Sequence, residues 1–241
     1  MPQLLYFFPR FYYGFDLTYL ILVVPALILV LAAQVKVKST FSKYSKVSSL
    51  RGLTGREAAE RVLSMNGVRN VRIEMVSGTL SDHYDPRSNV IRLSQGVYDS
   101  TSVAALGVAA HEAGHACQYS EGYVPIKIRN AILPVAGIGS NLAMPLVLIG
   151  LLFNFYFLIQ LGIIFYAAAT LFQLVTLPVE FNASSRAMQA LGSSRMLEES
   201  ELKQTRKVLS AAAMTYVASL AVALMSLLRL IIIAGGSRDR R

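Results

Sequence analysis

The sequence predicts an α-helical integral membrane protein with about four transmembrane helices and one small α+β part outside the bilayer. The first observation is composition: of the 241 residues, 54% are hydrophobic and 15% are charged, and the mean hydropathy is +0.48. An ordinary soluble domain carries about 25% charged residues. The second observation is that the apolar residues concentrate in four blocks, namely residues 17–35, 130–152, 155–178 and 209–234. Together these observations favour membrane spans over buried core helices.

Each of the four blocks is close to the roughly 20 apolar residues that a helix needs to cross a bilayer. None contains Asp, Glu or Lys, and the one Arg inside a block, Arg229, lies near the end of the fourth block, from where it can reach the interface. The first block is expected to be a permanent anchor and not a cleaved signal peptide, because lysines follow it directly. We therefore predict four spans, with re-entry of the fourth block as the alternative.

The positive charge of the chain, formally +9, is explained better by membrane topology than by nucleic-acid binding. Its cations gather after the first span, before the second, and between the third and fourth: Lys36, Lys38, Lys43, Lys46, Arg51, Lys127, Arg129, Arg186, Arg195, Lys203, Arg206 and Lys207. With four spans, all these segments lie on one side, which the positive-inside rule makes the cytoplasmic side. We expect a multi-pass protein of the cell membrane, with the lipid bilayer as a partner and no nucleic acid.

The polar stretch after the first span has the pattern of a small α+β part. Thr54 and Glu57 form a capping-box pattern that starts a helix over about 55–65, and strands are expected at 71–76 and 89–93. Residues 82–86 are rich in turn formers, and residues 94–100 are expected to be a loop. A helix rich in small residues follows over about 101–119. We expect residues 89–93 to offer a free strand edge to a bound peptide.

The most informative motif lies on this last helix. His111, Glu112 and His115 read H-E-x-x-H, and the chain has only one other histidine, His83. Residues i and i+4 share a helix face, so both rings can reach one metal ion, and the Glu beside them can act as a general base. Two imidazoles and a carboxylate on an apolar helix would be costly without such a role. The motif predicts a zinc site and a zincin-like metallopeptidase part on the cytoplasmic side.

A catalytic zinc takes three protein ligands, so a third must be found. No histidine follows His115 in the chain, so the ligand is His83 or a carboxylate, and Asp82 and Asp85 are conceivable. Glu121 is too close in sequence to turn back to the metal unless the helix ends sharply at Tyr119. The preferred candidate is Glu180, which lies where the third span leaves the bilayer, two spans after His115 and hence on the same side. The alternative for Glu180 is a structural charge near a helix start, or a salt bridge to Arg186.

These residues resemble the neutral zinc metallopeptidases of bacterial membranes called the YugP type. The resemblance rests on the H-E-x-x-H motif, the sequence from Glu180 to Ala187, the segment Asp82–Pro86, the segment Arg92–Ser94 and the four-span layout. More distantly, the chain is similar to the HtpX-type membrane proteases. Those proteases carry Asp where this chain has Ser184, and that Asp normally orients a zinc-binding histidine. The resemblance implies that Ser184 supports the site by a hydrogen bond without charge.

The expected mechanism is that of a gluzincin-like peptidase. Zinc bound by His111, His115 and Glu180 would activate water, and Glu112 would accept and return the proton. His83 is the candidate donor to the developing oxyanion, and Arg186 is expected to pair with Glu180 or Glu112. A His, His and carboxylate set suits zinc but would also accept cobalt or manganese.

The sequence thus favours a membrane-embedded zinc endopeptidase that acts on membrane-associated proteins or peptides near the cytoplasmic surface. The alternative is a catalytically silent zinc-binding scaffold or sensor, and a zinc transporter is disfavoured because the spans are nearly free of acids and histidines. The domain division expected along the chain is residues 1–35 (N-terminal segment and first span), 36–129 (zincin-like part), 130–178 (second and third spans), 179–208 (segment with the third ligand) and 209–241 (fourth span and tail).

Overall fold

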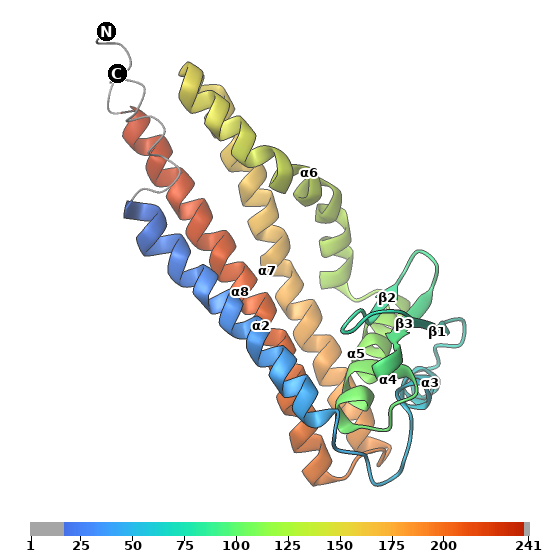
Figure 1. Cartoon of the computed structure of the whole chain (residues 1–241). Coiled ribbons are helices and arrows are strands. Elements are labelled where there is room, and N and C mark those ends of the chain that lie inside the picture. The colour runs from blue at the N-terminus through green and yellow to red at the C-terminus, as the bar shows by residue number, and fades with distance from the viewer. Residues whose placement is uncertain (1–16, 239–241) are drawn as a thin grey trace. The chain divides into compact units, whose positions relative to one another are not determined.

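The computed structural model describes residues 17–238 and is mostly helical, with one small mixed sheet (Figure 1). Its helices are η2 (Tyr19–Val23, a π-helix), α2 (Val24–Tyr44), α3 (Gly55–Met65), α4 (Gln95–Tyr98), α5 (Val103–Ser120), α6 (Val124–Phe153), α7 (Tyr156–Ser193) and α8 (Glu199–Arg238). Its strands are β1 (Arg72–Val76), β2 (His83–Asp85) and β3 (Val90–Ser94). The fold is therefore helical with a small α+β portion, as the sequence predicted.

The chain divides into two compact units. Unit 1 takes in the described residues up to 32, residues 128–176 and those from 216 onward, and unit 2 comprises residues 33–127 and 177–215. The long helices run from one unit into the other, so that the first part of α7 belongs to unit 1 and its last part to unit 2. Every residue of the H-E-x-x-H motif, and Glu180 as well, belongs to unit 2.

Four helices of the described chain are long and apolar enough to cross a membrane, in agreement with the four predicted spans. They are Tyr19–Tyr44, Val124–Phe153, Tyr156–Ser193 and Glu199–Gly235. Only 17–28% of the residues in their apolar stretches are buried inside the protein, which suits contact with lipid and not with water. Each helix is longer than the apolar block that predicted it, because polar turns continue it beyond the apolar run.

Within unit 1, small residues let α6 and α7 approach closely. A Cβ added at Gly139 would lie 2.8 Å from the carbonyl oxygen of Phe165, and one added at Gly162 would lie 2.6 Å from Val147. Close packing at small residues is how helices associate in a bilayer, where lipid removes the hydrophobic drive for association. These glycines therefore keep the second and third spans together.

The sheet of unit 2 has the order β1-β3-β2, with β3 parallel to β1 and antiparallel to β2. Two predictions are wrong here. Residues 83–85 form a strand and not a turn, and residues 95–98 form a short helix and not a loop. The turn lies a few residues later, where the Asp85 carboxylate accepts hydrogen bonds from the Arg87 N–H and the Ser88 hydroxyl. Asn89 ends this turn with a φ of 53°, a left-handed value that Asn tolerates.

The predicted free edge at residues 89–93 is also wrong. Strand β3 is the central strand, with a partner on each side, and its residues are largely buried. The outer edges of the sheet belong to β1 and β2. The sequence prediction missed this arrangement because it did not recognise β2 as a strand.

The core of unit 2 forms around α5. Helix α3, started by the predicted capping box between Thr54 and Glu57, packs its buried face on α5. Helix α8 approaches α5 from another direction at Gly107, where an added Cβ would lie 2.6 Å from Thr205. The Thr205 hydroxyl also donates to the Val103 carbonyl over 3.0 Å. The histidine helix is thus held by packing on several faces.

Candidate metal centre

Helix α5 places the two motif histidines one turn apart. Its first turn is capped by the Ser102 hydroxyl, which accepts from the Ala105 N–H over 3.2 Å. The small residues that follow, mostly Ala, let the helix lie largely buried in unit 2. The rings of His111 and His115 lie 4.7 Å apart between centroids, and their Nε2 atoms are 3.1 Å apart. Both Nε2 atoms therefore point at one place.

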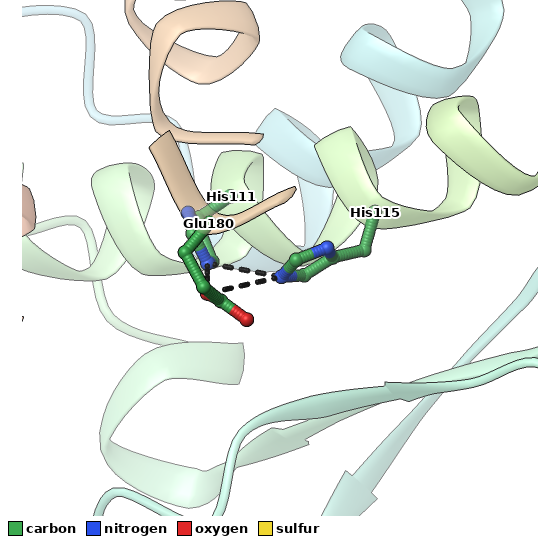
Figure 2. A group of neighbouring side chains, drawn as sticks. All are labelled: His111, His115 and Glu180. Carbon is green, nitrogen blue, oxygen red and sulfur yellow. Dashed lines mark hydrogen bonds and ion pairs between the residues drawn. The ribbon is translucent and has the colours of Figure 1, made fainter. Parts of the chain in front are cut away.

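Helix α7 brings a carboxylate to the same place (Figure 2). One oxygen of Glu180 lies 3.3 Å from Nε2 of His111 and 3.5 Å from Nε2 of His115. This is possible because α7 comes close to α5 at Gly114, where an added Cβ would lie 2.9 Å from the carbonyl oxygen of Ala183. Glu180 is 3% exposed, so its charge is removed from water. A buried carboxylate needs a cation nearby.

The three ligand atoms fit a tetrahedral metal. Tetrahedral zinc with bonds of about 2.0–2.2 Å holds its ligand atoms about 3.3–3.5 Å apart. The observed separations are 3.1, 3.3 and 3.5 Å. The Glu180 oxygen in this cluster is buried and has no hydrogen-bond donor among the described residues. Of the third ligands considered from the sequence, Glu180 is the one that forms a cluster with both histidines in the described chain.

The remaining ring nitrogen of each histidine has a partner that orients the ring. The Ser184 hydroxyl lies 3.1 Å from Nδ1 of His111, and the Gln118 side-chain oxygen lies 3.0 Å from Nδ1 of His115. The Gln118 amide nitrogen donates to the Val179 carbonyl over 2.8 Å and to the Asn182 side-chain oxygen over 2.9 Å. Because the Gln118 amide nitrogen donates to these two acceptors, the side-chain oxygen of Gln118 faces His115. Nδ1 of His115 must then carry the proton that this oxygen accepts. Its Nε2 then keeps a lone pair for a metal.

Gln118 and Asn182 are the supporting residues that the sequence reasoning missed. Gln118 is fully buried, and it lies three residues after His115 on the same side of α5. A polar amide at this spacing in a helix of small apolar residues is a signal that could have identified it. Asn182 gives no comparable signal, because its role depends on the approach of α7 to α5.

The cluster favours positive charge at its centre. Burial lowers the pKa of His115, but the nearby carboxylates of Glu180 and Glu112 outweigh this effect and hold the pKa above its ordinary value. A site that attracts a proton in this way also attracts a metal cation. The donor set, two imidazoles and one carboxylate, is the type that zinc prefers in sites that keep a position for water.

Glu112 lies beside the cluster and is held by the sheet. Its side chain is almost fully buried, and one carboxylate oxygen accepts a hydrogen bond from the backbone N–H of Tyr84 over 2.9 Å. Because this N–H donates to Glu112 and not to β3, it lies on the outer edge of the sheet. The predicted general base and the edge of β2 are therefore in direct contact.

His83 is exposed on β2, next to Tyr84 in the chain. Its Nδ1 donates to the Ser81 carbonyl over 2.8 Å. In the neutral ring Nε2 is then an acceptor, which does not suit a donor to an oxyanion. Among the contacts of residues 17–238, none joins His83 to the two motif histidines or to Glu180. Its catalytic role stays a prediction.

Arg186 does not make the expected ion pair with Glu180 or Glu112. Its two terminal nitrogens each donate to a different oxygen of Glu121 over 2.7 Å, and its Nε donates to Asn182 over 2.8 Å. Six helical residues separate Arg186 from Glu180, which places them about 240° apart around α7. Arg186 therefore faces the end of α5, where Glu121 ends the helix, and lowers the pKa of Glu121.

The other acidic candidates are engaged elsewhere in unit 2. Asp82 accepts from the backbone N–H of Ser94 over 2.7 Å and from the Ser94 hydroxyl. Asp85 holds the turn after β2 and lies 3.1 Å from Arg92, and these contacts keep the pKa of its carboxyl well below the usual range.

The single cysteine, Cys117, is buried in the core, and burial raises the pKa of its thiol to about 11. It is a residue of the hydrophobic core.

Comparison with known proteins agrees with this geometry. The model of a family described as "Putative neutral zinc metallopeptidase" matches residues 19–235, nearly the whole chain. The chain belongs to this family. It is 49% identical over 221 residues to a protein of Bacillus subtilis (strain 168) named "Putative membrane protease YugP", covering 92% of this chain and 98% of that protein. The resemblance inferred from the sequence is confirmed.

No solved structure matches the chain. Membership of the family implies zinc, and the cluster of His111, His115 and Glu180 could hold it. The four candidate spans and the relative named "Putative membrane protease YugP" agree that this chain is a membrane protein.

Proposed function

We propose that this chain is a membrane-embedded zinc endopeptidase that hydrolyses peptide bonds in membrane-associated proteins or peptides near the cytoplasmic surface. The observation that carries the proposal is the convergence of three ligand atoms, 3.1–3.5 Å apart, beside the buried carboxylate of Glu112. A binding scaffold would need the ligands, but it would not need a carboxylate held next to them by the sheet.

The proposed chemistry divides between the metal and the chain. Zinc, when bound, supplies a water of lowered pKa, near 7, and polarises the peptide carbonyl. Glu112 accepts the proton of that water and delivers it to the leaving amine. The Tyr84 N–H holds the Glu112 carboxylate in place, and Gln118 and Ser184 fix the two imidazole rings. His83 is retained as a candidate for oxyanion stabilisation.

The outer edge of β2 is the proposed place for the substrate backbone. At Tyr84, the N–H points to this edge, and an extended peptide that adds to the sheet there would lie beside Glu112. Strand β3 is excluded from this role by its two partners. A cavity of about 620 Å³, lined by Tyr84, Ala116 and Tyr119 and by residues 67–71 before β1, could take a substrate side chain.

The proposed position of the site follows from the apolar runs and the charges. The apolar run of the third span ends at Pro178, two residues before Glu180 in the same helix. The metal centre would therefore lie near the surface of the bilayer. The cations of the chain cluster on the segments that share this side, which supports a cytoplasmic location.

The test combines metal content with cleavage of unfolded casein by protein purified in detergent. The variants are Glu112→Gln, Glu180→Ala and, as a control carboxylate outside the cluster, Glu121→Gln. We expect about one zinc per chain in the wild type, Glu112→Gln and Glu121→Gln, and strongly reduced zinc in Glu180→Ala. Cleavage should be lost in Glu112→Gln and Glu180→Ala and retained in Glu121→Gln.

Two outcomes would contradict the proposal in different ways. Full zinc retention in Glu180→Ala would move the third ligand elsewhere, and His83→Ala would then be measured. Zinc without cleavage in the wild type, together with unchanged cellular function of Glu112→Gln, would favour a silent zinc-binding scaffold or sensor.

A further inference from the structure

A second cavity of unit 2, of about 940 Å³, lies between α2 and α8 and is not used by the proposed chemistry. It is lined from α2 by residues that include Lys36 and Lys43, and from α8 by residues that include Lys203, Arg206 and Lys207. One residue of α7, Met188, completes the lining. The metal ligands are not among the residues around it.

The lining residues lie on one face of each helix. On α2 they are spaced four, three and one residues apart, beginning at Lys36 and ending at Tyr44. On α8 they recur every three or four residues from Glu199 to Met214. This is the spacing of a continuous helix face, so the cations of both helices are directed to a common space. Lys38 and Lys46, which belong to the same basic segment, do not line it.

The charge of this cavity is strongly positive. Five cations line it, and Glu199 is the one acid among the lining residues. Glu199 lies 3.7 Å from Lys203, an exposed pair that neutralises little. Within the described chain, the other four cations have no carboxylate within ion-pair distance. The cavity therefore offers several unneutralised positive charges to an anion.

The cavity also lies at the level where the apolar runs end. Lys36 directly follows the first apolar block, and Lys207 lies two residues before the fourth. Its wall includes apolar side chains, among them Tyr44, Leu202 and Met214. Cations beside apolar side chains, at the end of a membrane span, match the boundary between a lipid headgroup and its acyl chains.

We propose that this cavity binds the phosphate headgroup of an anionic phospholipid. The cations would contact the phosphate, and the apolar wall would contact the start of an acyl chain. An acidic peptide would be attracted by the same charge, but it would leave the apolar wall without a partner. A basic pocket between membrane helices is a known way in which anionic headgroups are recognised.

The face of α8 opposite the cavity indicates how lipid binding would change the stability of the protein. Thr205 packs against Gly107 and donates to the Val103 carbonyl, so this part of α8 supports the helix that carries the histidines. A ligand that binds only the folded protein raises its stability. Anionic lipid would therefore raise the temperature of unfolding of unit 2 without contacting the metal ligands.

The test uses the full chain in a neutral detergent. Separate titrations use short-chain phosphatidylglycerol, phosphatidylcholine of the same chain length, inorganic phosphate and an oligoglutamate peptide. Native mass spectrometry measures the bound ligand, and circular dichroism measures the midpoint of thermal unfolding. The variant Arg206→Gln/Lys207→Gln is compared with the charge-matched control Lys38→Gln/Lys46→Gln, whose residues do not line the cavity.

We expect phosphatidylglycerol to bind and to raise the unfolding midpoint of the wild type. The cavity variant should bind it about 25-fold more weakly, which corresponds to about 1 kcal/mol for each cation removed. The control variant should stay within about twofold of the wild type. If the α8 variant does not fold, Lys36→Gln/Lys43→Gln tests the other wall of the cavity.

Each of four results would overturn the proposal. Equal binding of phosphatidylcholine would show that the cations do not select the ligand. Equal binding of inorganic phosphate would indicate a site for free anions. Tighter binding of oligoglutamate would indicate a docking site for acidic peptides. An equal loss in the control variant would show that only the total charge matters.

Discussion

The partners that orient the two histidines differ in how firmly they are themselves held. His115 is oriented by Gln118, whose amide is itself fixed by two acceptors on α7. His111 is oriented by the Ser184 hydroxyl, where the HtpX-type proteases carry a carboxylate. A neutral partner increases the basicity of the imidazole less than a charged one does. Because two acceptors hold the Gln118 amide, we expect the Gln118 network to contribute more to the rigidity of this site than Ser184 does.

The first prediction concerns Gln118. Replacing Gln118 with Leu removes the partner of Nδ1 of His115 and leaves the buried Val179 carbonyl without its donor. Loss of such an orienting contact typically costs 10- to 100-fold in metal affinity. We expect a decrease of about that size for zinc, measured by competition with a chelating dye. Ser184→Ala should cost less, and unchanged affinity in Gln118→Leu would contradict the network.

The second prediction concerns the pair between Arg186 and Glu121. Arg186 lowers the pKa of Glu121, so the pair stabilises the fold fully above the ordinary carboxyl pKa and progressively less as the pH falls through the lowered pKa. Because the pair is partly exposed, its contribution should be at most about 1 kcal/mol. The unfolding midpoint of Glu121→Gln should lie slightly below that of the wild type at pH 7. The difference should disappear in acid, and a gap that persists there would contradict the assignment.

At the scale of elements, the site depends on how closely α5 and α7 approach. Neither helix contains a complete ligand set, and Gly114 is the point at which the backbone of α7 comes near α5. The sheet contributes through β2, whose Tyr84 N–H holds Glu112. The three elements that build the site are thus far apart in sequence, and each carries only part of it.

The third prediction concerns Gly114. The Cβ of an alanine there would lie 2.9 Å from the Ala183 carbonyl oxygen and would force α5 and α7 apart. We expect a loss of about 1–3 kcal/mol in stability and a reduced zinc content, measured by thermal unfolding and metal analysis. Gly137→Ala is the matched control, because this helical glycine has open space around it. That control should be neutral or slightly stabilising, since Ala favours a helix.

For the whole molecule, the arrangement of spans decides which side of the membrane the proposed site faces. The cations cluster from the end of α2 to the start of α6 and from the end of α7 to the start of α8, whereas the short connection at Asn154 between α6 and α7 carries none. By the positive-inside rule, we expect Asn154 outside and Ser200 on the cytoplasmic side. This orientation would determine which substrates can reach the proposed site.

The fourth prediction tests the orientation by cysteine labelling. The native Cys117 should not react, since it is buried and its pKa is raised to about 11. In intact cells, an impermeant maleimide should label Asn154→Cys and should label Ser200→Cys only after the membrane is opened. The wild type provides the unlabelled control, and the reverse pattern would place the metal centre outside the cytoplasm.

The sequence by itself determined the helical membrane class, the four apolar spans and the family. These follow from local properties: the length of the apolar runs, the spacing of His111 and His115 along one helix, and the sequence from Glu180 to Ala187. Hydropathy and helical periodicity act over neighbouring residues, so they can be read without knowing the fold. The capping box at Thr54 was predictable for the same reason.

Only the tertiary structure decided which groups meet. In the folded chain, Glu180 lies beside the histidines, and Arg186 pairs with Glu121. Strand β3 lies at the centre of the sheet, and the Tyr84 N–H donates to Glu112. Each of these contacts joins residues of different elements, and it depends on the side of a helix or strand that packing turns inward. Packing is set by the shapes of all the neighbours together, such as the close approach at Gly114, and it has no counterpart in a short stretch of sequence.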